Sequence, residues 1–315
     1  MPLPELELIQ RIRRAAARGH TNPSHGIGDD CAVLDIPHGH EVLITTDFSL
    51  EGIHFRREWH PPDSVGHRCL ARGLSDIAAM GGIPRTAFLS LALPADLPQR
   101  WADEFIRGLL RLARRYSVTL AGGDTAQSAN GILADIIVVG SIPKGKAILR
   151  SGARPGDLIY ASGTLGASVA TLEKLLAGKK LHPRMHSRHF YPDPRIAVAR
   201  YLSEHKLASA MIDTSDGLST DLRHICEESR VGAVVDQTLF PALPEDGTFR
   251  NALHGGEDYE LLLTVPPART AKLPAKIAGV PITRIGTITR GRQIKLKSPN
   301  GKLHALPPEG WQHFA

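Results

Sequence analysis

The sequence predicts an α/β (α+β layered) protein with two domains. Strand-like and helix-like segments alternate along the chain, which is typical of layered α/β domains. The alternation is interrupted at residues 144–157, where Gly, Pro, Lys and Arg dominate and indicate a domain boundary. With 315 residues, the chain is long enough for two domains of ordinary size. We therefore expect domains at residues 1–146 and 147–315.

The first half carries clear apolar periodicities. Trp101 and Phe105 belong to an apolar face that recurs at helical spacing, with Arg and Asp on the opposite face. The helix predicted at 63–82 is expected to end at Gly81-Gly82, and Pro84 follows. On this basis we expect strands at 41–47, 86–93, 118–125 and 132–142, and helices at 63–82 and 98–116.

The second half repeats the alternation of strands and helices. We expect strands at 158–163, 232–236 and 259–265, helices at 167–176 and 195–205, and a loop at 211–222. Residues 177–194 are polar, basic and contain proline, so they predict a surface loop. The histidines in this segment have no regular ligand spacing, so we interpret them as solvated.

Composition places the chain among soluble globular proteins. Hydrophobic residues make up 42% and charged residues 22%, and no stretch reaches the roughly 18 apolar residues that span a bilayer. The N-terminal segment lacks the apolar core of a signal peptide. Cys31, Cys69 and Cys226 are scattered and odd in number, which favours a reducing cytoplasm and no disulfide framework.

The net charge of +6 allows an anionic partner. The arginines are dispersed, aromatic residues make up only 5%, and no long basic run occurs, so a nucleic-acid partner is disfavoured. A phosphorylated small molecule fits a mildly basic surface equally well.

Carboxylates follow small residues or end apolar strands at several separate places. In GIGDDCAVL (26–34), Asp29 and Asp30 stand side by side between glycines and an apolar run, and Asp47 ends the predicted strand 41–47. The same pattern recurs at Asp76, Asp124, Asp213, Asp216, Glu257 and Asp258. Any one of these acids fits ordinary turn chemistry. Clustered carboxylates, however, repel each other unless cations screen them, so the repetition favours a site for several Mg²⁺ ions.

The metal interpretation points to polyphosphate chemistry without a P-loop. Several Mg²⁺ ions in one cleft typically bridge phosphate oxygens and neutralise developing charge. The chain has no GxxxxGK[ST] motif and no kinase-type glycine loop joined to an HRD catalytic loop. GTLGAS (163–168) is only a weak glycine-rich loop, for which close packing is the alternative explanation.

The motifs together resemble the thiamine-monophosphate kinase family, which makes thiamine diphosphate from thiamine monophosphate and ATP. The segments that carry the resemblance occur in the family's order over nearly the whole chain. They are GIGDDCAVL (26–34), TTDFSLEGIHF (45–55), LSDIAAMGGIP (74–84), AGGDT (121–125), AILRSGARPGD (147–157), MIDTSDGLSTDL (211–222), GGEDYELLLT (255–264) and GWQHF (310–314). GGDT and SDGL alone are shared with a wider superfamily that includes aminoimidazole ribonucleotide synthetase and selenophosphate synthetase.

The resemblance implies a role for particular residues. Several Mg²⁺ ions would be held by Asp30, Thr45, Thr46, Asp47, Asp76, Asp124, Asp213 and Asp216. ATP, the co-substrate, would be contacted by Gly123, Asp124, Arg150 and Ser215, and thiamine monophosphate by His54, Glu257 and Trp311. The family transfers the γ-phosphoryl group in line and directly, so no residue is expected to act as a covalent nucleophile.

Plainer explanations stay open for some of these residues. His54 fits a packed histidine, Arg150 a charge in a linker, and Trp311 an anchor for the C-terminus. Asp29 fits a residue that only caps or orients Asp30. The chain also departs from the usual family pattern at Phe48, Ser49, Gly73, Ala126 and Gln127, which affects the placement of the phosphates more than the acids.

The resemblance also implies an assembly and a location. We expect a cytoplasmic homodimer whose interface is formed by the N-terminal mixed sheet with its helices, and a C-terminal α/β domain that completes the active site. The nearest alternative keeps the ATP site but changes the acceptor, as in the sister synthetases of the superfamily. A second alternative is a non-catalytic protein that binds nucleotides or RNA through its basic surface, but such a protein has no need of all the acids.

Overall fold

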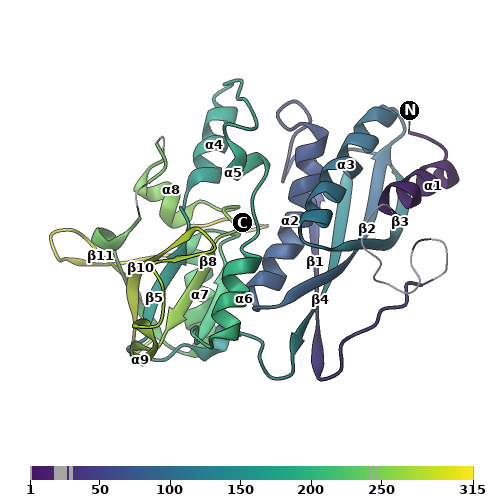
Figure 1. Ribbon diagram of the computed structural model, residues 1–315. Coiled ribbons are helices and arrows are strands. Elements are labelled where there is room, and N and C mark those ends of the chain that lie inside the picture. Colours follow the sequence, from purple (N-terminus) through teal and green to yellow (C-terminus); the bar gives the residue numbers. More distant parts are fainter. Residues whose placement is uncertain (1, 18–26, 28–30, 242, 246, 315) are drawn as a thin grey trace. The chain divides into compact units, whose positions relative to one another are not determined.

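The computed structural model describes residues 2–17, 27, 31–241, 243–245 and 247–314 (Figure 1). The chain divides into two compact units, and the division is not contiguous in sequence. Unit 1 comprises residues 1–77, 82–145 and 180–192, and unit 2 comprises residues 78–81, 146–179 and 193–315. The expected division into 1–146 and 147–315 therefore differs from the compact units chiefly at residues 180–192, which pack with unit 1.

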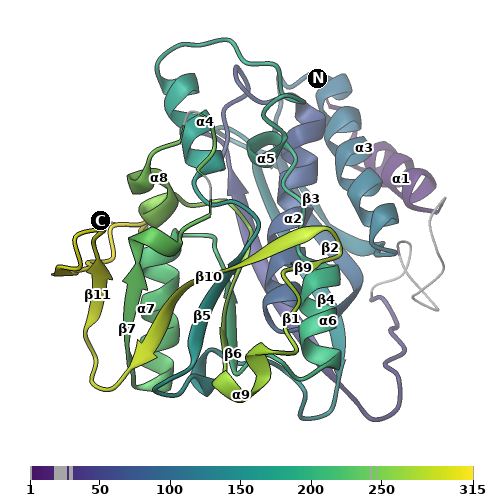
Figure 2. The ribbon, with the colours of Figure 1, turned by 60° about the vertical axis from the view of Figure 1, so that its left-hand side comes forward.

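Unit 1 is a four-stranded mixed sheet with helices on one face (Figures 1 and 2). Its elements are α1 (Glu5–Ala16), β1 (His40–Leu50), α2 (Pro62–Ala79), β2 (Ile83–Pro94), α3 (Gln99–Arg115), β3 (Thr119–Ser128), β4 (Leu133–Pro143) and α5 (Ser187–Phe190), with the last two residues of α2 assigned to unit 2. The strands lie in the order β1-β4-β2-β3, and only the β2–β3 pair is parallel.

Glycines allow the helices of unit 1 to pack closely. A Cβ atom at Gly66 of α2 would collide with the backbone of Phe105 in α3, and one at Gly108 of α3 would collide with Asp63. Gly73 of α2 lies against Val138 of β4, which fixes the face of the sheet that α2 covers. The opposite face is not covered by these helices.

Unit 2 is built on a mixed sheet of eight strands. Its elements are η1 (Arg150–Gly152), β5 (Leu158–Ser162), α4 (Ala167–Leu176), α6 (Ile196–Glu204), β6 (Ala210–Asp213), α7 (Leu218–Ser229), β7 (Gly232–Asp236), η2 (Gln237–Leu239), α8 (Phe249–His254), β8 (Leu261–Val265), α9 (Pro267–Thr270), β9 (Lys276–Ile277), β10 (Val280–Thr289), β11 (Ile294–Lys297) and β12 (Leu303–Ala305). The strand order is β12-β11-β7-β10-β5-β8-β6, with β9 paired to β10. Leu222 and Ile225 of α7 join the same apolar core as Ile159 and Leu262 of the sheet.

The α/β class and the mixed sheets agree with the sequence prediction, but three local predictions were wrong. β1 continues three residues beyond Asp47 because Leu50 still pairs with Leu133 of β4, so Asp47 does not end the strand. Residues 211–222 are not a loop, since they contain most of β6 and the start of α7. Within residues 177–194, the first part is exposed as expected, but His189 and Phe190 are buried, so His189 is not solvated and the segment is a surface loop only in part.

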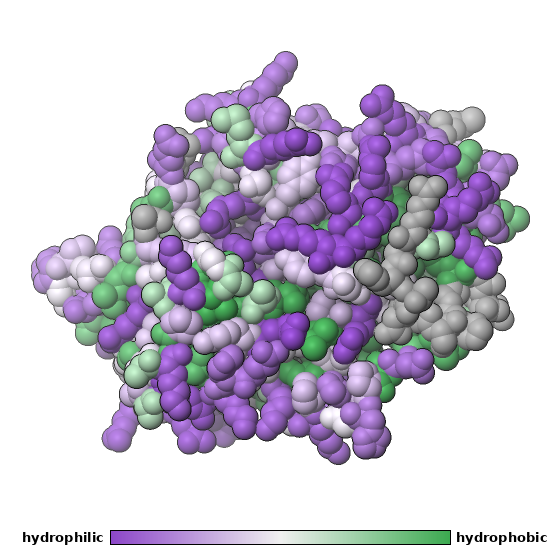
Figure 3. Space-filling model, in the orientation of Figure 1, coloured by the Kyte–Doolittle hydropathy of each residue, from purple (hydrophilic) through white to green (hydrophobic). Residues whose placement is uncertain are grey.

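The hydropathy of the surface and of the helices narrows the class of protein only slightly. Hydrophilic side chains cover most of the face visible in Figure 3, and apolar ones lie in small groups between them. No helix in the described part of the chain is both long and apolar enough to cross a membrane.

Candidate active site

The first group of predicted residues lies on the face of the unit 1 sheet that α2 covers. Side chains alternate along a strand, so Thr45 and Asp47 of β1 point to the same face as Leu43, which packs against the apolar core that includes residues of α2. The hydroxyl of Thr45 donates a hydrogen bond to Asp76 of α2. Arg72, one turn earlier in α2, donates from Nε to Oδ1 of Asp47 at 3.2 Å. Each of these two acids is therefore held in place by a neighbouring side chain.

The second group lies on the opposite face of the same sheet. Ser90 of β2 is the register partner of both Asp124 in β3 and Asp135 in β4, so these side chains share a face. Thr46 of β1 also points to this face and donates to Oδ1 of Asp135 at 2.7 Å. The predicted acids of unit 1 that the structure describes therefore divide between two faces of one sheet, with Asp47 and Asp76 on the α2 side and Asp124 on the other.

Asp135 was missed by the sequence reasoning. It lies in ILADIIVV (132–139), where a single acid interrupts an otherwise apolar strand, and that interruption is the signal that could have found it. Its partner Thr46 belongs to the predicted set.

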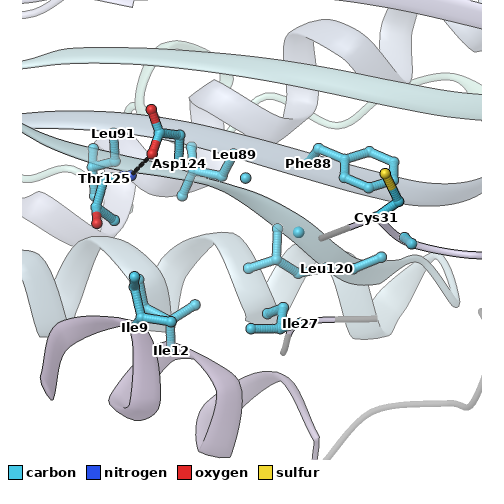
Figure 4. Close-up of a pocket in the computed structure, with 14 residues that line it drawn as sticks. Ile9, Ile12, Ile27, Cys31, Phe88, Leu89, Leu91, Leu120, Asp124 and Thr125 are labelled. Atoms are coloured by element: carbon cyan, nitrogen blue, oxygen red, sulfur yellow. Dashed lines mark hydrogen bonds between the residues drawn. The ribbon is translucent and has the colours of Figure 1, made fainter. Parts of the chain in front are cut away.

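An apolar cavity of about 560 Å³ opens beside Asp124 (Figure 4). Ile9 and Ile12 of α1 line one wall, and Cys31 lies at the end away from Asp124. The remaining lining comes from Ile27, Ala32, Phe88, Leu89, Leu91, Leu120, Ala121, Gly122, Gly123 and Thr125. Gly123 has a φ of +143°, and a Cβ there would collide with the carbonyl of Leu89, so only glycine fits where β3 approaches β2. The cavity has the size of a small-molecule site.

In unit 2, the end of β6 and the segment 255–260 interlock through their backbones. The amide of Glu257 donates to the carbonyl of Ser215 at 2.8 Å, and the amide of Tyr259 donates to the carbonyl of Thr214 at 3.0 Å. Glu257 and Tyr259 have φ values of 62° and 51°, which residues other than glycine rarely adopt. Strain of this kind persists only where the surroundings impose it, and it is frequent at functional sites.

The C-terminal segment joins the same structure. The amide of Trp311 donates to the carbonyl of Asp216 at 2.9 Å, and the indole is 54% exposed. Gly310, the residue before it, leaves no room for a Cβ against that same carbonyl. Unit 2 therefore brings together four predicted residues, namely Ser215, Asp216, Glu257 and Trp311.

Asp221 of α7 is a third acid in this region that the sequence reasoning did not single out. Its Oδ2 accepts a hydrogen bond from the amide of Gly217 at 3.0 Å, and its side chain is buried. Burial, followed by the charges of Asp213 and Asp216, raises the pKa of Asp221 well above its usual range. The signal was present in the sequence as the third acid of MIDTSDGLSTDL, one turn into the helix.

The other predicted residues have separate positions. Nδ1 of His54 accepts a hydrogen bond from the amide of Leu50 at 3.0 Å, in the turn after β1. Arg150 lies in η1 of unit 2, where its carbonyl accepts from the hydroxyl of Ser229 at 2.7 Å. Asp29 and Asp30 lie outside the described residues.

The donor chemistry fits a hard divalent cation. The proposed ligands are carboxylate and hydroxyl oxygens, which Mg²⁺ prefers. Within residues 2–17, 27, 31–241, 243–245 and 247–314, no three or more His, Cys, Asp or Glu side chains are grouped to hold a metal ion. The ligand set, distributed over both units and including Asp30, stays a prediction.

Two sequence models of one family match the two halves of the chain. The AIR synthase related protein, N-terminal domain, matches residues 28–142, and the AIR synthase related protein, C-terminal domain, matches residues 154–298. Together with the two mixed sheets, they define a two-domain protein of the AIR-synthase-related class.

Relatives and solved structures narrow this class. The thiamine-monophosphate kinase of Escherichia coli (strain K12) is 38% identical over 325 residues, covering 99% of this chain and 98% of the relative. The thiamine-monophosphate kinase of Stenotrophomonas maltophilia K279a has a crystal structure with 33% identity and a TM-score of 0.83, covering 96% of this chain and 99% of that one. AaThiL complexed with AMPPCP and TMP gives 32% identity and a TM-score of 0.79, covering 99% of this chain and 97% of that one. The chain belongs to the thiamine-monophosphate kinase family.

Proposed function

We propose that this protein phosphorylates thiamine monophosphate to thiamine diphosphate, with ATP as the phosphoryl donor. The observation that carries the proposal is the similarity over almost the full chain to thiamine-monophosphate kinases, together with the similar structure of AaThiL complexed with AMPPCP and TMP. The interlocked residues of unit 2 and the oxygen donors of unit 1 supply the groups that phosphoryl transfer needs.

The metal-binding residues would serve to gather phosphate oxygens. We assign Mg²⁺ binding to Asp30, Thr45, Thr46, Asp47, Asp76, Asp124, Asp213 and Asp216. When bound, Mg²⁺ neutralises charge that develops on the phosphoryl oxygens. The Thr45–Asp76 and Arg72–Asp47 contacts hold the carboxylates of unit 1 in fixed orientations, which lowers the reorganisation that reaction requires.

The nucleotide is assigned to Gly123, Asp124, Arg150 and Ser215. The apolar cavity that opens beside Asp124 supports this assignment, because a nucleobase requires an apolar slot next to the groups that hold its phosphates. Gly123 allows β3 to lie close against Leu89 of β2, which fixes the position of Asp124 beside the cavity. The guanidinium of Arg150 suits paired phosphate oxygens.

Thiamine monophosphate is assigned to His54, Glu257 and Trp311. The exposed indole of Trp311 offers a face for the cationic thiazolium ring, and such contacts are attractive. The positive φ at Glu257 fixes the direction in which its side chain leaves the backbone. Transfer is direct and in line, so the chain's own contribution is to position the two phosphates and exclude a covalent phosphoenzyme step.

The expected homodimer is part of the proposal. On the sheet face opposite α2, Val42, Ile44 and Phe48 of β1 are 45%, 70% and 53% exposed, which is unusual for a row of large apolar side chains. A second copy of the same face would bury this row. Light scattering should give the mass of a dimer, and Ile44→Lys should shift it toward that of a monomer; a monomeric wild type would contradict the dimer.

We also propose the cytoplasm as the location. Cys31, Cys69 and Cys226 are all free thiols, and Cys31 is exposed, which suits a reducing compartment where disulfides are rare. Fractionation of cells that express the protein tests this placement.

The decisive assay for the function is incubation of the purified protein with ATP, MgCl₂ and thiamine monophosphate, followed by chromatography for thiamine diphosphate. We expect thiamine diphosphate and ADP in equal amounts, and no product without Mg²⁺. Thiamine in place of thiamine monophosphate is the matched control and should give no product. ATP hydrolysis that leaves thiamine monophosphate unchanged would contradict the proposal and favour an acceptor of the sister synthetases.

A further inference from the structure

A short segment of the chain leaves unit 2 and packs onto unit 1. Residues 180–192 belong to unit 1, although the residues on both sides of them belong to unit 2. We call residues 186–192, which include α5, the strap. In Figures 1 and 2 α5 lies beside α2, and the contacts below place the strap against the beginning of α2 and the turn that precedes it.

The strap is anchored by two contacts near its C-terminal end. Nε2 of His67 donates to the carbonyl of Pro192 at 2.7 Å, and the hydroxyl of Tyr191 donates to Oδ1 of Asp63 at 3.2 Å. Burial, followed by the charge of Asp63, raises the pKa of Tyr191 to about 12, so the hydroxyl keeps its proton at neutral pH. These contacts fix the strap to the first two turns of α2.

The centre of the strap is buried. The imidazoles of His189 and His60 are 1% and 2% exposed, and their Nε2 atoms lie 3.1 Å apart. The ring of Phe190 packs against that of His60 with centroids 5.2 Å apart. A segment held in this way has one backbone position, and the carbonyl of His189 therefore has a fixed place.

Arg68 connects this fixed carbonyl to the turn that carries His54. Its side chain lies in α2 and the residue is 4% exposed. Nη1 donates to the carbonyl of His189, and Nη2 donates to the carbonyl of His54 at 3.2 Å. A guanidinium holds its donors in a planar fork, so it can bind two carbonyls in a defined geometry, which a lysine ammonium does not reproduce.

The ring of His54 is oriented from its other side. Because Nδ1 accepts a hydrogen bond from the amide of Leu50, the neutral imidazole carries its proton on Nε2. In the proposed role of His54, this Nε2–H group donates a hydrogen bond to the anionic substrate. The orientation of that donor depends on the position of the His54 backbone, which Arg68 and the amide of Leu50 hold.

We propose that Arg68 is a positioning residue for the substrate, which couples the buried strap to His54 and so sets the affinity for thiamine monophosphate. The inference rests on the proposed function for its kinetic readout and on the contacts of Arg68 for its structural one. It assigns a role in substrate binding to a segment, residues 186–192, that contributes none of the proposed ligands.

The kinetic test is Arg68→Lys, with Arg111→Lys as the matched control. Arg111 pairs with Asp63 at 3.0 Å and is close to the strap, but unlike Arg68 its side chain is 54% exposed. We expect Arg68→Lys to raise the KM for thiamine monophosphate about tenfold, with the KM for ATP changed less than about twofold, and Arg111→Lys to change neither. In the double variant, Arg68→Lys should add nothing to the effect of His54→Ala, because both changes remove the same oriented donor. Equal changes in both KM values, or full additivity, would overturn the inference.

The structural test does not depend on turnover. Long-range ¹H–¹⁵N spectra report which imidazole nitrogen carries the proton, and the His54 signals are assigned by their loss in His54→Gln. We expect the Nε2-protonated form in the wild type and averaged signals in Arg68→Lys. Unchanged His54 signals in Arg68→Lys would overturn the positioning role whether or not thiamine diphosphate forms, whereas absence of thiamine diphosphate with the wild type overturns the proposed function alone.

Discussion

The two units hold their acidic residues by different physical means. In unit 1, Asp47 and Asp76 lie on a strand and a helix and are oriented by side chains, since Thr45 donates to Asp76 and Arg72 to Asp47. In unit 2, the functional candidates lie on connecting segments and are held by backbone hydrogen bonds, such as that from Glu257 to Ser215. Side-chain substitutions should therefore act locally in unit 1, whereas unit 2 should be sensitive to changes in backbone freedom.

The largest effect is expected from Asp124→Asn in unit 1. The only hydrogen bond the structure gives this carboxylate, among the described residues, comes from the amide of Thr125 at 2.9 Å, and an Asn oxygen can still accept it. Turnover should fall roughly 100-fold or more, because a charged ligand for Mg²⁺ is lost, while the melting temperature stays unchanged.

Asp135→Asn is the matched control on the same sheet face. It removes a carboxylate that is outside the proposed ligand set, so turnover should fall less than about threefold. Equal losses of turnover in Asp124→Asn and Asp135→Asn would show that turnover depends on the total negative charge of this sheet face and not on Asp124 in particular.

Gly217→Ala tests the backbone of unit 2. Gly217 has a φ of +116°, and a Cβ there would lie 2.7 Å from the backbone of His254, so the variant should lose about 2–4 kcal/mol of unfolding free energy and most of its activity. Gly291, with a φ of +85° and nothing within 4 Å, provides the comparison, and Gly291→Ala should cost about 1 kcal/mol and leave activity intact. Urea unfolding measures both, and equal losses would show that steric contact at Gly217 is unimportant.

Asp221→Asn tests the cost of ionising a buried acid that lies beside Asp213 and Asp216 in unit 2. The folded-state pKa of Asp221 is raised, so its ionisation opposes folding, and wild-type stability is lost as the pH rises from the unfolded pKa through the folded one. The Asn variant lacks this loss and should become the more stable protein as the pH increases, in urea titrations without Mg²⁺. Addition of Mg²⁺ should reduce the difference in unfolding free energy between the two proteins. A difference that does not change with pH would contradict the raised pKa of Asp221.

The smallest effects are expected from Thr45→Val and Thr46→Val. Loss of the hydrogen bond to Asp76 should reduce the free energy of unfolding by about 1 kcal/mol, because the bond is partly buried. Thr46→Val removes the exposed bond to Asp135 and should cost less than about 0.5 kcal/mol. Thermal unfolding without Mg²⁺ compares the two variants. A larger loss of unfolding free energy in Thr46→Val than in Thr45→Val would contradict this prediction.

The sequence predicted regular elements well where local signals were complete. The helix 167–176 and the strand 232–236 have the expected limits, since each periodic segment is bounded by small or charged residues. The limits of β1 depend on its pairing with β4 about 80 residues later, and that pairing has no local signal. The burial of His189 could not be predicted either, because it depends on His60 from a distant segment.

The candidate site divides in the same way. The motif segments predicted the acids, and the structure places Ser215, Asp216, Glu257 and Trp311 together as a group. Asp135 and Asp221 were missed because their partners, Thr46 and the amide of Gly217, become neighbours only in the folded chain. The distribution of Thr45 and Thr46 over two faces follows from strand alternation, which the motif alone does not reveal.

The most direct test of the central claim follows the transferred phosphorus itself. In ³¹P spectra of the protein with ATP, MgCl₂ and thiamine monophosphate, we predict that the resonances of thiamine diphosphate and ADP grow in equal amounts as that of thiamine monophosphate declines, and that Asp124→Asn stops both. Appearance of inorganic phosphate in place of thiamine diphosphate, with thiamine monophosphate unchanged, would contradict the account.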